Sequence, residues 1–194
     1  LMASPNLRTS VGFTLSDAEL EPRLLTGLAA VEQQLAVAVK SSDSFVAEAS
    51  RHLVDAGGKR FRPLLTLLAA EYGDHAAPGV VPSAVVVELT HLATLYHDDV
   101  MDEASRRRGA ESANSRWGNT VAILTGDFLF ARASDILADL GPEAVRLQAR
   151  TFERLCVGQI RETVGPEAGV GAVDHHLSVL ADKTGSLIAT AARF

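Results

Sequence analysis

The chain has 194 residues, of which 47% are hydrophobic, so it can bury a sizeable core and a disordered chain is excluded. Its net charge of −6 argues against a general nucleic-acid binder, which needs a basic surface. Cys156 is the single cysteine, so no internal disulfide can form and we expect a cytoplasmic protein. No apolar run reaches the roughly 18 residues that a transmembrane segment needs.

The start of the chain is expected to differ from the rest. Residues 1–15 are mixed in character and contain serine and proline, which predicts a flexible N-terminal arm. A single all-helical domain is expected over residues 16–194, because no internal repeat or linker interrupts it. Leu1 stands before Met2, which is not a natural start, so we interpret it as a cloning remnant or as part of a longer parent chain.

Apolar residues recur at spacings of three and four along almost the whole chain, and alternation with a period of two is nearly absent, which predicts an all-α fold. Ser16 and Glu19 form a capping box for the first helix, and Gly57-Gly58 and Gly141-Pro142 provide stops. The expected helices cover residues 16–40, 44–56, 60–72, 83–103, 119–140 and 143–163, and a last helix from about residue 173 still runs at Phe194. This order predicts a helix bundle that is truncated before it closes.

The stretch LATLYHDDVMDEASRRRG, residues 92–109, places three aspartates and three consecutive arginines directly after an apolar helical run. Asp98 and Asp102 are four residues apart, so their carboxylates share one helical face about 5–6 Å apart. Like charges at this spacing destabilise a bare helix, whereas a divalent cation reverses that effect. The alternative is a solvated helix end, but apolar neighbours such as Leu89 and Tyr96 indicate a buried helix. We therefore expect a Mg²⁺ site.

His91 precedes Asp98 by seven residues, which places it two turns back on the same helical stripe. Such a histidine either packs in the core or contacts a ligand, and the sequence leaves both interpretations open. Asp99 points about a quarter-turn away from this stripe.

Two cationic segments flank the acidic helix in the sequence. GGKRFRP (Gly57–Pro63) places Lys59, Arg60 and Arg62 at a helix start, where a glycine turn, free amides and cations can bind an anion. A plain glycine stop is the alternative there. RRRG (Arg106–Gly109) follows the acidic helix and, taken alone, would be a charged loop. Because both segments occur together, and guanidinium groups match phosphate oxygens, we expect a diphosphate held by Mg²⁺ and by direct ion pairs.

At this point the ordered motifs match a known family. GGKRFRP, HDDVMD, RRG, WGNTVAILTGDFLFA and DKTGSLIATA make residues 20 to 194 resemble the N-terminal part of a trans-isoprenyl (polyprenyl) diphosphate synthase. HDDVMD resembles the first aspartate-rich motif of that family. The resemblance implies an isoprenoid-synthase-type helix bundle, truncated before its C-terminal helices, and a homodimer.

The resemblance also implies the roles of individual residues. Isopentenyl diphosphate would contact Lys59, Arg62, His91 and Arg108. Asp98 and Asp102 would be the Mg²⁺ ligands. The allylic prenyl diphosphate would contact Arg107, Lys183 and Thr184. Without the resemblance, the sequence would favour surface positions for Lys183 and Thr184. Gln159 occupies the family's GQ position beside that pocket. The catalytic set would be Asp98, Asp102, Arg107 and Lys183.

The activity implied by the resemblance is Mg²⁺-dependent head-to-tail condensation of isopentenyl diphosphate with an allylic prenyl diphosphate. Residues one turn before Asp98 would line the first stretch of the product tunnel. They are Ala93 and Thr94, where short-chain members of the family place bulky aromatic residues. A small tunnel floor predicts a medium- to long-chain all-trans polyprenyl diphosphate, of the kind used for quinone side chains.

Two departures from the family pattern leave an alternative open. Glu111 and Ser112 stand where members of the family usually have proline and threonine, and no second aspartate-rich motif occurs before Phe194. The alternative is a non-catalytic isoprenoid-binding or partner subunit, or an inactive fragment. A carboxylate di-metal bundle is disfavoured because it needs a pair of ExxH motifs, and the sequence does not contain two. Terpene cyclisation is disfavoured by the cations of the isopentenyl site. We expect Cys156 to pack in the core.

Overall fold

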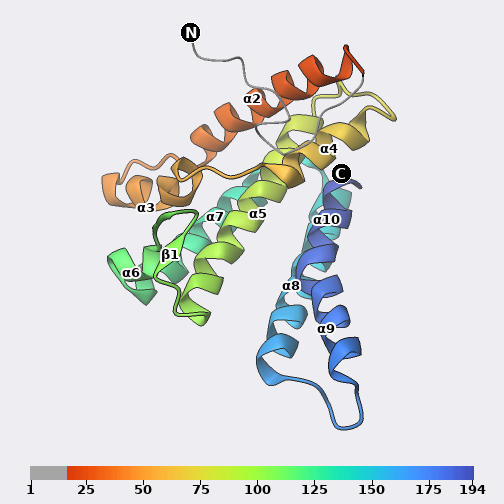
Figure 1. Ribbon diagram of the computed structural model, residues 1–194. Helices are drawn as coiled ribbons and strands as arrows, with labels where there is room; N and C mark the ends of the chain where they lie inside the picture. The colour runs from red at the N-terminus through yellow and green to blue at the C-terminus, as the bar shows by residue number, and fades with distance from the viewer. Residues whose placement is uncertain (1–16) are drawn as a thin grey trace.

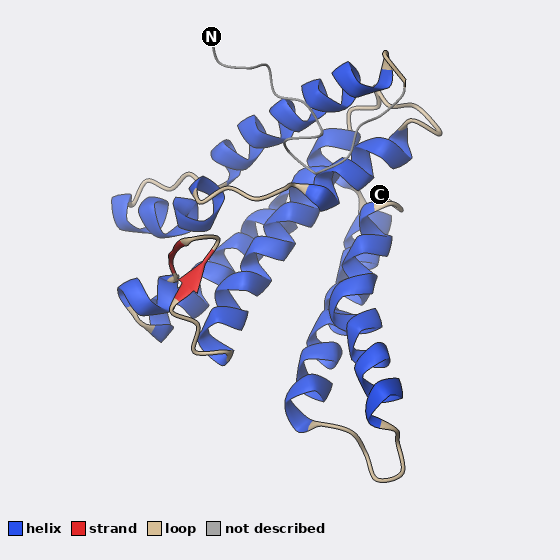
Figure 2. Cartoon of the chain, viewed as in Figure 1, coloured by secondary structure: helices blue, strands red, loops and turns tan. Residues whose placement is uncertain are grey.

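The computed structural model describes residues 17–194, and its regular structure is almost entirely helical, which confirms the all-α prediction (Figures 1 and 2). The predicted arm, residues 1–15, lies outside the described residues. The helices are α2 (Leu20–Ala38), α3 (Ser44–Asp55), α4 (Phe61–Ala70), α5 (Val80–Met101), α6 (Ala113–Trp117), α7 (Asn119–Leu140), α8 (Pro142–Val164), α9 (Ala172–Leu180) and α10 (Ser186–Ala191). A π-turn, η1 (Ala181–Gly185), joins the last two.

The helix starts are explained by local hydrogen bonds. Asp17 Oδ1 accepts hydrogen bonds from the amides of Glu19 and Leu20 at 2.8 and 3.0 Å, so this aspartate satisfies two amides at the start of α2. The capping box expected there includes Ser16, which lies outside the described residues. At α3, Asp43 is the N-cap residue and its side chain accepts from two amides of the first turn.

Helix α5 lies at the centre of the fold and packs along α7 (Figure 1). Its residues Leu89, Leu92, Ala93 and Tyr96 are fully buried, as the apolar run predicted. The Tyr96 hydroxyl donates to the carbonyl of Ala49 at 2.6 Å and accepts from the amide of Leu53 at 3.2 Å. These bonds join α5 to α3. They fix the part of α5 that directly precedes the acidic motif.

A short β-hairpin and a short helix connect α5 to α7, and the sequence did not predict either. Strand β1 (Arg106–Arg107) pairs antiparallel with β2 (Ala110–Glu111). Arg108 and Gly109 form the turn with φ values of +52° and +82°, the left-handed backbone that a tight two-residue hairpin turn requires. Strands of two residues are too short to show an alternation of apolar and polar residues, so no sequence pattern predicts this hairpin.

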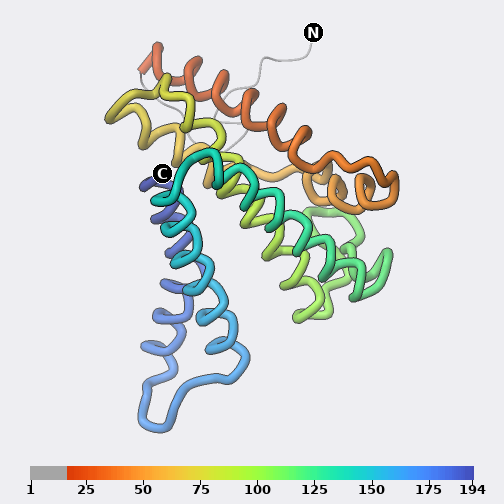
Figure 3. The backbone as a smooth tube through the Cα atoms, turned by 180° about the vertical axis from the view of Figure 1, so that it is seen from behind, coloured from red at the N-terminus to blue at the C-terminus, as the bar shows by residue number. Residues whose placement is uncertain are grey.

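The C-terminal part of the described chain is an antiparallel pair in which α8 runs down and α9, η1 and α10 return beside it (Figures 1 and 3). The expected last helix begins as predicted, but it contains the π-turn and ends at Ala191, so the expectation that it still runs at Phe194 is wrong. Helices α4 and α10 also pack together. Within residues 17–194, no helix combines the length and apolar character needed to cross a membrane.

Candidate active site

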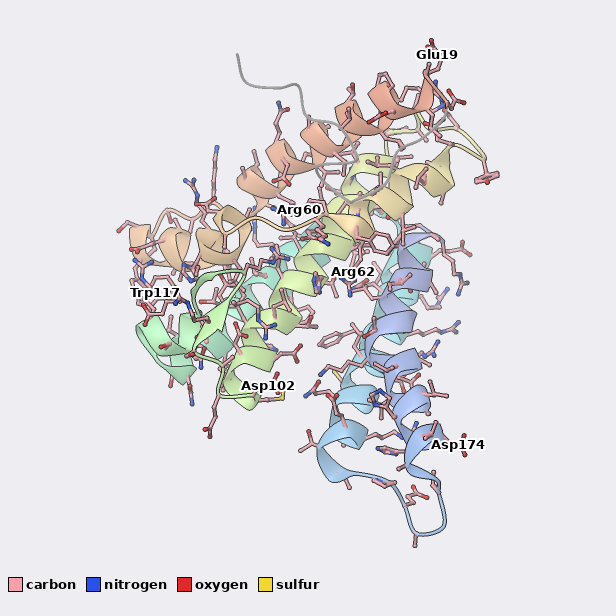
Figure 4. The ribbon with its side chains drawn as sticks, viewed as in Figure 1. Glu19, Arg60, Arg62, Asp102, Trp117 and Asp174 are labelled. Atoms are coloured by element: carbon pink, nitrogen blue, oxygen red, sulfur yellow. The ribbon has the colours of Figure 1, made fainter. Side chains whose placement is uncertain are left out.

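A cavity of about 360 Å³ lies between α5, α8 and η1, with α4 contributing at one end. Its wall contains most of the residues that the sequence singled out: Arg62, His91, Thr94, Asp98, Gln159, Lys183 and Thr184. Figure 4 shows Arg62 on the side of α5 that faces α8 and α10. A larger cavity of about 720 Å³ lies between α8 and α10, but none of the predicted site residues lines it. The chemistry of the wall, rather than size, therefore identifies the candidate site.

Of the two aspartates expected to bind a metal, Asp98 lies in the last turn of α5, and Asp102 directly follows the helix as its C-cap residue. Figure 4 labels Asp102 at this end of α5. Asp98 is half-buried and lines the cavity, whereas Asp102 is exposed at the helix end and does not. Burial raises the pKa of Asp98; the charge of Lys183 opposes this rise and that of Asp102 adds to it. A desolvated carboxylate with a second carboxylate one turn away is an arrangement that a cation stabilises.

The middle aspartate of the motif has a different environment. Asp99 is fully buried, and its Oδ1 accepts from Arg107 Nε at 2.6 Å and lies 2.5 Å from Arg107 Nη2. Its other oxygen, Oδ2, is buried and has no hydrogen-bond partner. Asp99 thus attaches the β-hairpin to α5. The predicted diphosphate contact, Arg107, is consequently directed at Asp99 and does not line the cavity.

Arg60 does not have the role that the sequence suggested for it. Its side chain is only 7% exposed and forms ion pairs with Glu32 of α2 at 2.5 Å and Glu88 of α5 at 3.0 Å. It also donates to the carbonyls of Val54 and Gly57, at the end of α3. The interpretation of Arg60 as a cation for an anion site is therefore wrong. It joins three helices instead, and its own backbone is left-handed with φ +48°.

Arg108 packs against the glycine turn of GGKRFRP. It donates to the carbonyls of Leu53, at 3.1 Å, and Gly57, and its Nη2 lies 3.6 Å from Glu88 Oε1. Gly58 has φ +146°, which side chains rarely adopt, and a Cβ atom there would lie 2.8 Å from Arg108 Cζ, so glycine favours both this backbone and the place of the guanidinium. The glycines therefore do more than end a helix, because they accommodate an arginine 50 residues away in the chain.

The isopentenyl-site candidates are only partly brought together. Arg62 and His91 line the cavity, and Arg62 Nε is buried with no partner. Burial lowers the pKa of Arg62, and the neighbouring charge of Arg108 lowers it further. Lys59 is exposed and, like Arg108, is not part of the cavity wall.

His91 was expected either to pack in the core or to contact a ligand. It lies in the cavity wall, where a ligand could reach it. Burial, followed by the charges of Arg62 and Arg108, lowers the pKa of His91 to about 3. The imidazole is therefore neutral at physiological pH. It can donate a hydrogen bond to an anion without carrying a charge of its own.

The opposite wall is formed by α8 and η1. Lys183 Nζ lies 2.5 Å from Glu162 Oε2, an acidic partner that no sequence pattern indicated. Gln159 carries a buried Oε1 without a partner. Cys156 is exposed and lines the cavity, so the expectation that it packs in the core is wrong.

The two chain-length candidates face different ways. Thr94 lines the cavity, and its hydroxyl donates to the carbonyl of His91 at 2.7 Å. Ala93 is fully buried in the core between α5 and α7 and does not line this cavity. A further cavity lies between α7 and α8, and it shares His97 and Phe152 with the candidate site.

Known proteins share this architecture. The crystal structure of geranylgeranyl pyrophosphate synthase from Corynebacterium glutamicum, complexed with calcium and isoprenyl diphosphate, matches with a TM-score of 0.82 and 47% identity, over 93% of this chain and 55% of that one. The described helices therefore form the isoprenoid-synthase-type bundle that the sequence predicted.

Two further relatives are similar in sequence. The nonaprenyl diphosphate synthase of Mycobacterium tuberculosis is 50% identical over 183 residues, covering 94% of this chain and 55% of that protein. Heptaprenyl diphosphate synthase component 2 of Geobacillus stearothermophilus is 45% identical over 136 residues, 70% of this chain and 42% of that protein. The chain thus spans about half the length of these relatives. The sequence model of the polyprenyl synthetase family matches residues 43–194, and the chain belongs to that family.

Proposed function

We propose that this protein is a prenyltransferase that condenses isopentenyl diphosphate with an allylic prenyl diphosphate to give a medium- to long-chain all-trans polyprenyl diphosphate. The observation that carries the proposal is one cavity whose wall contains Arg62 and His91 toward α4, Asp98 at the other end of α5, and Lys183 and Thr184 on η1 across from Asp98. Similarity to a nonaprenyl diphosphate synthase at 50% identity supports the substrate class and the product length.

Asp98 and Asp102 are the residues that would hold Mg²⁺. The fit rests on the donor set, since two carboxylates one turn apart leave positions for water and for diphosphate oxygens. The desolvated state of Asp98 also favours a cation beside it. Residues 17–194 contain no group of three or more metal-ligating side chains, so the diphosphate itself would complete the coordination. When bound, the cation would neutralise charge on the leaving diphosphate. A relative of known structure is complexed with calcium, which supports a divalent cation here.

Lys183 and Thr184 would bind the allylic diphosphate on the α8–η1 side, and Arg107 would have to leave Asp99 to reach it from the hairpin. As the allylic C–O bond breaks, charge develops on the diphosphate oxygens, and a fixed ammonium group stabilises that charge. Glu162 would have to share or release Lys183 when the diphosphate binds, because their 2.5 Å ion pair occupies the same ammonium group.

Isopentenyl diphosphate would lie on the α4 side. The unpartnered Nε of Arg62 and the neutral ring of His91 supply donors at the cavity wall, and Lys59 and Arg108 supply charge behind them. The double bond attacks the allylic carbon, a C–C bond forms, and a proton is lost to the released diphosphate. Phe152 and Leu155 contribute apolar surface to the wall, which helps to exclude water from the carbocation.

A second candidate function is favoured by one specific relative. The Geobacillus protein is named as one component of a synthase, so this chain could also need a partner subunit of a different sequence. We expect a homodimer instead, because Ile123 and Leu124 leave apolar surface exposed on α7, at 42% and 61%.

The experiment is an elongation assay with labelled isopentenyl diphosphate and allylic primers of increasing length, with Mg²⁺ or with EDTA, read by mass spectrometry. The proposal predicts products that differ by single five-carbon units and disappear with EDTA. If the protein alone yields no product but does so when a second subunit is added, the partner-subunit function is correct.

A further inference from the structure

The two residues proposed to bind the allylic diphosphate lie in an irregular segment of the chain. Lys183 and Thr184 lie in the π-turn η1, the one π-helical segment found between residues 17 and 194. A π-turn widens the helix by one residue per turn and is often found at functional sites. Here the hydroxyl of Ser186 donates to the carbonyl of Asp182 at 2.5 Å, which satisfies a carbonyl within the irregular turn.

A buried glycine of α8 lies directly under this turn. If Gly158 carried a Cβ atom, that atom would lie 2.7 Å from the backbone nitrogen of Lys183 and 3.1 Å from Asp182 Cβ. A separation below 3.0 Å forces the neighbour to move, and the neighbour is backbone rather than the end of a flexible side chain. The absence of a side chain at Gly158 therefore sets how closely η1 approaches α8.

Ion pairs hold the turn in that position. Asp182 lies 2.8 Å from Arg154 Nη2 and 3.6 Å from Arg161 Nη1, both from α8. Lys183 pairs with Glu162, also from α8, at 2.5 Å. Because these contacts lie on both sides of Gly158, η1 cannot move away from α8 without breaking them.

We propose that Gly158 is a positioning residue for the allylic diphosphate, because it fixes the distance between α8 and η1 and thereby places Lys183 and Thr184 opposite Asp98. The inference rests on the proposed function for the identity of the ligand. A methyl group at Gly158 displaces the backbone of η1, so the ammonium group of Lys183 no longer meets the diphosphate. The isopentenyl side, held by α4 and α5, is left in place.

The test compares two glycine-to-alanine variants that add the same methyl group, one on α8 against the turn and one at the last residue of the turn. In Gly158→Ala we expect the KM for the allylic diphosphate to rise by about tenfold or more, because displacements near 1 Å at such sites have large effects. The KM for isopentenyl diphosphate should stay within about twofold. In Gly185→Ala the added Cβ would meet nothing closer than the Leu180 carbonyl at 3.7 Å, so both KM values should be unchanged.

An equal rise in both KM values, or no rise in Gly158→Ala, would overturn the proposal. If Gly158→Ala does not fold, Asp182→Ala decides instead, because it removes the carboxylate that holds η1 to Arg154 and Arg161 and leaves the glycine unchanged. That variant should also raise the allylic KM selectively, and unchanged allylic binding would overturn the proposal.

Calorimetry with inorganic diphosphate and Mg²⁺ separates this inference from the proposed function, since it needs no turnover. If the protein makes no prenyl product but Gly158→Ala still weakens diphosphate binding and Gly185→Ala does not, the positioning role stands while the proposed function fails. If product forms normally and diphosphate binding is equal in both variants, the positioning role fails alone.

Discussion

The guanidinium group of Arg107 forms an ion pair with the buried carboxylate of Asp99, with Nη2 and Oδ1 2.5 Å apart. This contact explains why acidic and basic residues are so concentrated in this part of the sequence. Asp98 faces the cavity, whereas Asp99 faces the hairpin, so adjacent aspartates have separate tasks. One belongs to the candidate metal site and the other holds an arginine in place.

Asp99→Ala is expected to reduce the free energy of unfolding by about 1–3 kcal/mol, which is below the effect of a fully buried pair because the Arg107 side chain is 29% exposed. Urea denaturation measures the change. Arg51→Ala is the matched control, since its ion pair with Asp55 is exposed at 57% on both sides, and it should cost less than about 0.5 kcal/mol. Equal losses in the two variants would show that the Asp99 pair has no special role.

Asp98→Asn should lower kcat by about 10²–10³ and raise the Mg²⁺ concentration needed for half-maximal rate, because it removes a carboxylate from the cavity wall. Steady-state rates over a Mg²⁺ titration measure both effects. Asp135→Asn, on the exposed surface of α7, is the control and should behave like the unmodified protein. A normal metal dependence in Asp98→Asn would contradict the metal assignment.

The lowered pKa of His91 predicts a pH dependence of stability. Its pKa is about 3 in the folded protein and near 6.5 in the unfolded chain, so the unfolded state binds the additional proton. Stability is therefore complete above about pH 6.5 and falls as the pH drops toward 3. At about pH 5 this histidine should cost roughly 1–2 kcal/mol.

His91→Gln tests this pH effect, because it removes the titrating group and should flatten the loss of stability between about pH 6.5 and 5. Denaturation curves at both pH values measure the difference. His176→Gln, on α9, is the control and should retain the loss. An unchanged pH profile in His91→Gln would mean that His91 is not held neutral by its surroundings.

Thr94→Phe is expected to shorten the product distribution, because Thr94 lines the cavity and an aromatic ring would fill the path of the growing chain. Mass spectrometry of the products measures the shift, and Thr26→Phe on the surface of α2 is the control. The sequence also predicts shorter products for Ala93→Phe. Since Ala93 is buried in the core, that change should in addition cost about 1–3 kcal/mol of stability through overpacking. Unchanged products in Thr94→Phe would exclude this path.

The sequence predicted the helices because these depend on short spacings, whereas most residues of the cavity wall, Lys183 and Thr184 among them, were expected from the family resemblance. Apolar residues three and four apart define a helix and its buried face, and a carboxylate pair four apart must lie on one side of it. The same rules place His91 and Asp98, seven residues apart, on one stripe of α5, and both line the cavity.

What the sequence did not predict depends on contacts between distant residues. Arg60 and Arg62 are both cations at one helix start, and only Glu32 and Glu88, each 28 residues from Arg60, decide that Arg60 turns inward. The close approach of η1 to α8 depends in the same way on Gly158, which lies 25 positions before Lys183. No local propensity distinguishes such a glycine from an ordinary one within a helix.

The central claim is that one cavity holds two diphosphates on separate sides. Calorimetry with isopentenyl diphosphate and with a thiolo analogue of an allylic diphosphate, which resists ionisation, tests it most directly in the presence of Mg²⁺. The account predicts that Arg62→Ala abolishes binding of isopentenyl diphosphate but spares the analogue, while Asp98→Asn has the opposite effect. Loss of both ligands in each variant, or of neither, would contradict it.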